Sequence, residues 1–126
     1  MQSLIQKKSY GSVKVFWLER ELAISVLKER AVRLVQKNTN VLAVILFGSL
    51  AENRAVPGSD ADILIVLSES SERFIDRPLN FFHYFEGLGL PVELFCYTEE
   101  EIPRVPLAKA AAARGLVLAK RELINP

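Results

Sequence analysis

Short, almost continuous apolar runs separated by polar turns dominate the pattern of hydrophobic and polar positions along the chain. They lie at Val41 to Phe47 (VLAVILF), Ile63 to Leu67 (ILIVL) and Val92 to Tyr97. Runs of this length that are rich in branched residues are typical of strands buried on both faces of a sheet. The pattern therefore predicts strands, two of them central, at these positions.

Segments of helical character alternate with these runs. Between Trp17 and Lys37 there is no glycine or proline, and apolar residues recur at spacings of three and four (Ile24, Leu27, Ala31, Leu34 and Val35). This stripe predicts an amphipathic helix that ends at the turn-forming cluster Asn38-Thr39-Asn40. Asp76 before Pro78 predicts the start of another helix, which Gly87 and Gly89 end, with one apolar face formed by Leu79, Phe82, Phe85 and Leu88.

The two ends of the chain complete the predicted architecture. Ser12 to Phe16 alternates polar and apolar residues, so residues 1–16 are expected to form either a short edge strand or an arm. Near the other end, Pro106 is suited to the first turn of an alanine-rich helix that Gly115 closes, and Leu116 to Leu118 can form a last short strand. We expect one α/β (α+β) domain over residues 1–126, a mixed sheet of four or five strands with helices packed on it.

Composition narrows the class of protein. A chain of 126 residues that is half apolar can bury one core, and a formal net charge of +1 gives no strong nucleic-acid signal. The single cysteine, Cys96, excludes an internal disulfide and fits a reducing cytoplasm. No apolar stretch approaches the ~20 residues of a membrane span. The expectation is a soluble cytoplasmic protein without a membrane partner.

Two acidic residues at the start of the second apolar run suggest a metal site. Asp60 and Asp62 stand two positions apart, and alternate side chains of a strand point to the same face, about 6.6 Å apart. Two ionised carboxylates in a partly desolvated site repel each other, and a divalent cation keeps both charged. A bare Asp-x-Asp also occurs at solvated loop ends and helix caps, so this pair needs support from elsewhere in the chain.

That support comes from the Gly-Ser pair that follows the first strand. Gly48 allows close approach of the backbone to a ligand, and Ser49 supplies a hydroxyl. The residues after Ser49 can begin a helix, whose free N–H groups bind anions. An isolated Gly-Ser pair is more often a plain turn, but here it precedes the paired aspartates.

The stretch FGSLAENRAVPGSDAD, from Phe47 to Asp62, resembles the signature of the minimal nucleotidyltransferases of the DNA polymerase beta superfamily. Its pattern is Gly-Ser, a spacer of about ten residues, and Asp-x-Asp. The resemblance covers Val41 to Leu118 in element order, and the helix before Val41 also matches. It implies a nucleotidyltransferase fold and transfer of a nucleoside monophosphate from ATP or another NTP, with release of pyrophosphate.

The resemblance also implies roles for individual residues. Gly48 and Ser49, together with Ser59, are expected to bind the nucleotide, and Asp60 and Asp62 to bind two Mg2+ ions. A third acid is expected on a later strand, and Glu93 is the candidate because it interrupts the apolar run that follows Pro91. Its alternative is an edge-strand glutamate that faces water. All three acids are expected to be catalytic, with Glu93 available as general base.

This chain departs from the family pattern at two points. Glu52-Asn53 stands where relatives often have Arg-Gly, so a positive charge near the triphosphate is missing there, although Arg54 can substitute. The third acid is glutamate where aspartate is commoner, a longer side chain that leaves the ligand geometry open. Neither change removes a ligand type.

The resemblance further implies a partner. Many small members of this family act as antitoxins that transfer AMP to a tyrosine of an all-helical HEPN toxin, and this chain looks like that kind. The alternatives are a non-catalytic module that masks its partner by contact, and an aminoglycoside-type nucleotidyltransferase, which usually carries a helical second domain for which the sequence has no room. The acceptor, the preferred base and the oligomeric state, including a homo-oligomer, stay open.

Several other residues are assigned structural roles. His83 is expected to be a partly buried structural histidine, and the aromatic residues around it (Phe81, Phe82, Tyr84 and Phe85) are expected to be core. Lys109 and Arg114 can contact phosphate, but solvated charges on a helix face are the default interpretation.

Overall fold

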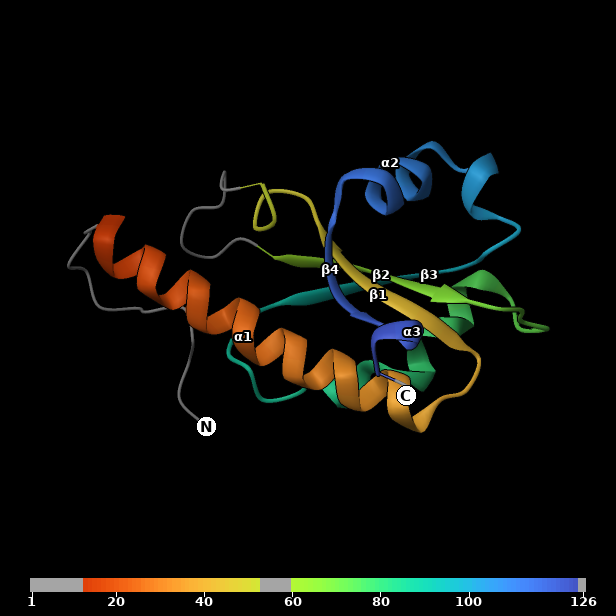
Figure 1. The fold of residues 1–126 in the computed structure, drawn as a ribbon, viewed down its shortest axis with the longest axis horizontal. Helices are drawn as coiled ribbons and strands as arrows, with labels where there is room; N and C mark the ends of the chain where they lie inside the picture. Colours follow the sequence, from red (N-terminus) through yellow and green to blue (C-terminus); the bar gives the residue numbers. More distant parts are fainter. Residues whose placement is uncertain (1–12, 53–59, 125–126) are drawn as a thin grey trace.

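The computed structural model describes residues 13–52 and 60–124, with side chains described for residues 20–52 and 60–122. The predicted mixed architecture is confirmed (Figure 1), with α1 (Val13–Lys37), β1 (Val41–Phe47), β2 (Ala61–Leu67), β3 (Val92–Thr98), α2 (Pro106–Arg114), β4 (Leu116–Lys120) and α3 (Arg121–Ile124). The connections contain short 3-10 segments, η1 (Phe74–Asn80), η2 (Phe82–Phe85) and η3 (Ile102–Arg104). No helix among these described residues is long and apolar enough to cross a membrane.

The four strands form one mixed sheet in the order β3-β2-β1-β4. Strand β1 is antiparallel to both of its neighbours, β2 and β4, whereas β2 and β3 are parallel. Parallel neighbours need a crossover connection rather than a tight hairpin. The η1 and η2 segments form that crossover, and it carries the chain back so that β3 starts beside the start of β2.

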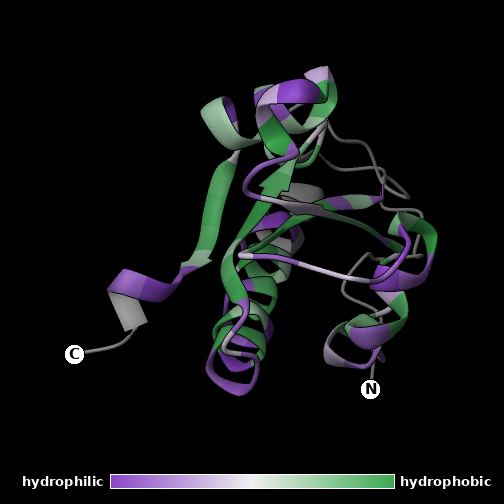
Figure 2. Cartoon of the chain, turned by 90° about the vertical axis from the view of Figure 1, so that its right-hand side faces the viewer, coloured by the Kyte–Doolittle hydropathy of each residue, from purple (hydrophilic) through white to green (hydrophobic). Residues whose placement is uncertain are grey.

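Helices cover both faces of the sheet, as Figure 1 shows with α1 on one side and α2 on the other. Along β2, Ile63 and Ile65 pack in the larger core with α1, while Leu64 and Val66 pack in a smaller cluster with α2. Successive side chains of a strand point to opposite faces, so a strand covered on both faces is apolar throughout. Figure 2 accordingly shows the strands of the sheet coloured mainly as hydrophobic.

Two arginines, the half-buried Arg121 and the buried Arg77, connect distant segments of the chain through backbone carbonyl groups. Arg121 donates to the carbonyl oxygens of Val35 at 2.7 Å and Asn38 at 2.6 Å, and so satisfies carbonyl groups at the end of α1. Arg77, only 6% exposed, donates to the carbonyl oxygen of Cys96 at 3.1 Å and forms an ion pair with Glu101 at 2.7 Å. These long-range contacts use residue types that the apolar pattern does not reveal.

The edge strand expected from Ser12 to Phe16 is wrong for the described part of that range, because residues 13–16 belong to α1. Extending an existing helix costs little once its first turn has formed, whereas a five-residue strand needs a partner strand. The rest of the predicted arm, residues 1–12, lies outside the described residues.

The helix expected to start at Asp76 and to end at Gly87 and Gly89 is replaced by the two 3-10 segments η1 and η2. Pro78 lies inside η1 and cannot donate a helical hydrogen bond, which disfavours a continuous α-helix there. The predicted apolar face is therefore split. Phe85 and Leu88 are buried, but Leu79 and Phe82 are exposed.

Candidate active site

The parallel pairing of β2 and β3 places two of the three predicted acids on facing positions. Asp62 and Glu93 are direct register partners, so their side chains leave the same face of neighbouring strands. Such strands lie about 4.8 Å apart. Asp60 directly precedes β2, and the next residue, Ala61, donates its N–H to the carbonyl oxygen of Pro91 at 2.8 Å. The backbone thus brings the three acids to one end of the β2–β3 pair.

The three carboxylates affect one another electrostatically. The pKa of Asp62 is raised above its ordinary value of 3.8, first by burial and then by the negative charges of Glu93 and Asp60. Asp62 is half-buried, whereas Asp60 and Glu93 are exposed. The pKa shift means that ionising Asp62 costs more than ionising an ordinary aspartate, and a positive charge beside it would reduce that cost.

This group of acids has the donor chemistry of a Mg2+ site, since carboxylate oxygens are the ligands that this cation prefers. As the side chains stand, however, no three His, Cys, Asp or Glu residues within 20–52 and 60–122 are arranged to hold an ion. The register of Asp62 and Glu93 is fixed by backbone hydrogen bonds, while the exposed carboxylates of Asp60 and Glu93 can turn about their side-chain torsions. The residues therefore fit a divalent cation in chemistry, and rotamer changes would be needed to enclose it.

The Gly-Ser turn lies directly against Asp62. Strand β1 ends at Phe47, the register partner of Asp62, and Gly48 follows with φ +79°, a conformation that favours glycine. A Cβ atom on Gly48 would lie 2.5 Å from Oδ2 of Asp62. The N–H of Glu52 donates to the carbonyl oxygen of Gly48 at 3.1 Å and closes a turn. A helix was expected to begin after Ser49, and as far as Glu52 the chain forms this turn instead. Residues 53–59 lie outside the described residues.

A cleft of about 560 Å³ opens between this turn and helix α2. The sheet side contributes Phe47, Gly48 and Asp62, and α2 contributes a face with helical spacing (Leu107, Ala110, Ala111 and Arg114). Ligand sites commonly have volumes of roughly 300–1,000 Å³. The cleft is therefore large enough for a nucleoside and reaches the most buried of the three acids.

A second glycine that lines the cleft, Gly115, also shapes it. Gly115 ends α2, and a Cβ atom there would overlap Cγ2 of Ile45 and lie 2.8 Å from the carbonyl oxygen of Leu46. Only a residue without a side chain lets the helix end come this close to β1. The position that was predicted simply to terminate a helix therefore also sets the distance between α2 and the sheet.

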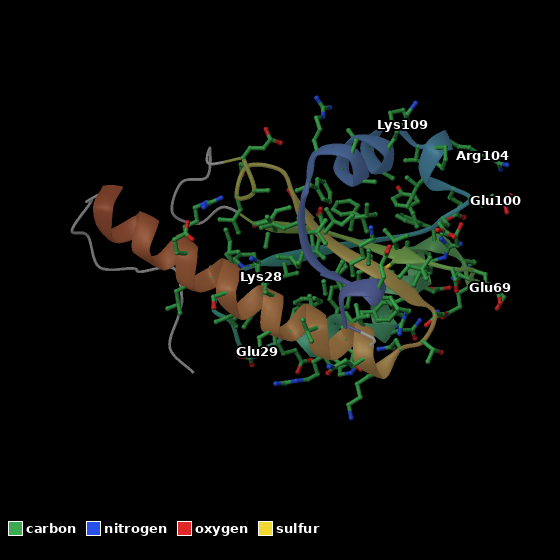
Figure 3. The ribbon with its side chains drawn as sticks, in the orientation of Figure 1. Lys28, Glu29, Glu69, Glu100, Arg104 and Lys109 are labelled. Carbon is green, nitrogen blue, oxygen red and sulfur yellow. The ribbon has the colours of Figure 1, made fainter. Side chains whose placement is uncertain are left out.

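Arg114 is the cleft residue that sequence reasoning set aside. It is the last residue of α2, is exposed, and lines the cleft together with Asp62. Its position in the sequence could have been recognised from its spacing, because Arg114 is three residues from Ala111 and four from Ala110 and so lies on the same helix face, next to the sheet. Lys109 lies outside this face and is exposed on α2 (Figure 3).

The remaining residues singled out in the sequence lie outside the cleft or outside the described residues. Ser59 and Arg54 lie outside the described residues. His83 is exposed rather than partly buried, and its ring contacts that of Tyr84 with centroids 4.2 Å apart. Its segment η2 packs on the α1 side of the sheet, away from the cleft. Of the aromatic residues expected in the core, Phe81 and Phe85 are buried, Tyr84 is half-buried and Phe82 is exposed.

Comparisons with known proteins identify a family and a shared fold. A family model described as "Nucleotidyltransferase domain" matches residues 24–118. A crystal structure of a candidate nucleotidyltransferase from Sulfolobus solfataricus superposes with a TM-score of 0.64 at 24% sequence identity, covering 82% of this chain and 85% of that chain. No curated protein sequence gives a significant match. At this identity the superposition shows a shared fold.

Proposed function

The chain belongs to the nucleotidyltransferase domain family, and from this premise we propose that it transfers a nucleoside monophosphate, AMP in particular, from an NTP to an acceptor hydroxyl. One observation carries the proposal. Asp62 faces Glu93 across the parallel strands, lies against the Gly48 turn and lines the cleft. This arrangement puts negatively charged oxygen donors next to a backbone turn suited to phosphate.

In the proposed mechanism, Asp60, Asp62 and Glu93 would hold two Mg2+ ions. Bound Mg2+ neutralises the charge that gathers on phosphate oxygens during transfer and favours loss of the acceptor proton. The turn after Gly48 binds the triphosphate through backbone N–H groups and the hydroxyl of Ser49. Phosphoryl transfer requires mainly positioning and charge stabilisation from the protein, and these residues supply both.

The proposed reaction balances as a single displacement. Glu93 accepts the proton of the acceptor hydroxyl while the hydroxyl oxygen forms a bond to the α-phosphorus. The bond between that phosphorus and the oxygen bridging it to the β-phosphate breaks. Pyrophosphate leaves with the negative charge. Arg114, which lines the cleft, supplies a positive charge to the phosphates in place of the arginine that relatives often carry at the Glu52-Asn53 position.

We further propose that the acceptor is a tyrosine of a HEPN-type protein. The exposure of Asp60 and Glu93 supports this, because an acceptor carried on a macromolecule has to reach the reacting phosphorus from solvent. The buried free thiol of Cys96 is compatible with the reducing cytoplasm proposed as the location.

The experiment combines nucleotide binding with detection of product. Wild-type protein is titrated calorimetrically with ATP and Mg2+, and then with ATP in EDTA, and a HEPN partner is analysed by mass spectrometry after incubation. We expect Mg2+-dependent binding and an added mass of one AMP. Asp62→Asn should reduce transfer by at least about 100-fold. The matched control is Glu69→Gln, because Glu69 is exposed beyond the other end of β2 (Figure 3).

A second candidate function is masking of the partner by contact alone. It is favoured by apolar side chains exposed on the crossover between β2 and β3 (Phe74, Ile75, Leu79 and Phe82). If Asp62→Asn neutralises the toxin as well as the wild type does, and the wild type itself forms no AMP adduct, masking is correct and the transfer proposal is refuted. Equal transfer by Asp62→Asn and Glu69→Gln would also refute the assigned active site.

A further inference from the structure

A buried arginine on α1 is bonded to the turn that follows Gly48. Arg20 is 8% exposed, and its Nε donates to the carbonyl oxygen of Leu50 at 3.0 Å. Its Nη2 donates to the carbonyl oxygen of Ala51 at 3.4 Å, and its Nη1 pairs with the exposed carboxylate of Glu21 at 3.0 Å. One side chain thus connects the helix to two consecutive peptide groups of the candidate phosphate-binding turn.

These bonds determine which way the peptide groups of the turn point. In a trans peptide the N–H is directed opposite to the C=O. Because the carbonyl oxygens of Leu50 and Ala51 are directed at Arg20, the N–H groups of Ala51 and Glu52 are directed away from α1. The N–H of Glu52 closes the turn onto Gly48, and both Ala51 and Glu52 line the cleft.

Leu50 fixes the same turn by packing. Its side chain is 1% exposed and belongs to the core on the α1 side of the sheet. Packing alone leaves the peptide planes free to rotate, whereas the planar guanidinium of Arg20 holds two carbonyl groups at once. Arg20 therefore supplies orientation that the core contact does not.

We propose that Arg20 is a positioning residue for nucleotide binding: it holds the turn at residues 48–52 in the conformation that receives the triphosphate. This inference rests on the proposed function. Arg20 contacts the turn from the α1 side and the cleft lies on the α2 side, so it acts through the peptide groups and not by touching the nucleotide. Its loss should weaken nucleotide binding more than the chemical step.

The same helix offers a matched control. Arg30 donates through Nη1 to the carbonyl oxygens of Tyr84 and Glu86, both at 3.1 Å, so it too ties α1 to a connecting segment by two carbonyl bonds. Tyr84 and Glu86 do not line the cleft. Arg30→Lys therefore removes a comparable pair of bonds without affecting the turn after Gly48.

The test compares Arg20→Lys, Arg20→Ala and Arg30→Lys in the full chain, by calorimetric titration with ATP and Mg2+, steady-state kinetics and thermal melting. We expect Arg20→Lys to raise the Kd and the KM for ATP about tenfold, with kcat changed less than about threefold. Arg20→Ala should bind ATP more weakly still. Arg30→Lys should bind ATP as tightly as the wild type does, although its Tm is lower. Amide hydrogen exchange within 48–52 should accelerate in Arg20→Lys only.

Two failures are distinguishable. If the wild type binds and turns over ATP but Arg20→Lys and Arg30→Lys have the same KM, the positioning role is refuted and the proposed function stands. The proposed function itself fails, and the inference with it, if the wild type does not bind ATP with Mg2+. A loss confined to kcat would also contradict the inference, because it would place Arg20 in the chemical step.

Discussion

Replacing Gly48 by alanine tests the geometry of the candidate site most directly. The substitution places a side chain at φ +79°, and its Cβ would lie 2.5 Å from Oδ2 of Asp62. The next nearest atoms of Asp62, Cγ and Cβ, would be at 3.4 and 3.6 Å, so the conflict is with the end of a movable side chain. The carboxylate has to turn away, whereas the backbone can stay in place.

Two magnitudes follow from these distances. A carbon and an oxygen atom in ordinary contact are about 3.5 Å apart, so the carboxylate must move by about 1 Å. A misplacement of that size in an active site can lower the rate about 100-fold. The left-handed backbone adds roughly 1–2 kcal/mol of strain for a non-glycine residue. For 126 residues, 1 kcal/mol corresponds to roughly 4 °C in Tm.

Gly87→Ala separates these two effects. Gly87 has nearly the same φ, +75°, and a Cβ there would meet no atom within 4 Å in the part of the chain that the structure describes. Both substitutions also restrict the unfolded chain equally, so that contribution cancels in the comparison. We expect both variants to melt roughly 4–8 °C below the wild type. Only Gly48→Ala should lose about 100-fold in kcat/KM.

Thermal melting, calorimetric titration with ATP and Mg2+, and kinetics on the three proteins check this expectation. If kcat/KM of Gly48→Ala stays within about twofold of that of Gly87→Ala, Asp62 either lies elsewhere or takes no part in the reaction. The reasoning from the close approach of Gly48 would then be wrong.

Three further predictions concern charge and burial. Because the pKa of Asp62 is raised in the folded protein, its ionisation lowers the stability of the fold as pH rises. Asp62→Asn should therefore raise the Tm of metal-free protein at neutral pH and abolish any increase in Tm on adding Mg2+. Thermal melts with and without Mg2+ measure both effects. Arg77→Met should lower the free energy of unfolding by roughly 2–4 kcal/mol in urea titrations. Hydrogen bonding from Arg77 lowers the pKa of Glu101 from 4.5 to about 2, so the pair stabilises the fold fully above pH 4.5 and progressively less as the pH falls toward 2. Arg77→Met should lose most of this pH dependence, because Glu101 then keeps the hydrogen bond from the N–H of Thr98 but not the larger contribution of Arg77. An unchanged acid transition would contradict the assignment. Burial raises the pKa of Cys96 to about 12, so a thiol reagent should label it only after unfolding, and rapid labelling of native protein would show that the core opens.

The positions of most elements could be predicted from the sequence because their boundaries are local. Strand β1 covers Val41–Phe47 as expected, since asparagine-rich and glycine turns bracket an apolar run. Helix α2 begins at Pro106 and gives way to Gly115, in keeping with the preferences of these residues at helix ends. The crossover was predicted wrongly, because Pro78 and tertiary packing together favour 3-10 turns over one α-helix.

The candidate site, too, could be predicted from the sequence only in part. The sequence determined which residues are chemically able to act, since a Gly-Ser pair, paired aspartates and an acid within an apolar strand can be recognised without coordinates. The tertiary structure alone decided that Glu93 lies opposite Asp62, because strand register depends on pairing between distant segments, and a shift by one residue would turn the side chain to the other face. It also placed Arg114 at the cleft and Arg20 behind the turn. A charged side chain has the same local pattern whether it meets solvent or a distant backbone carbonyl, and only the folded chain distinguishes the two.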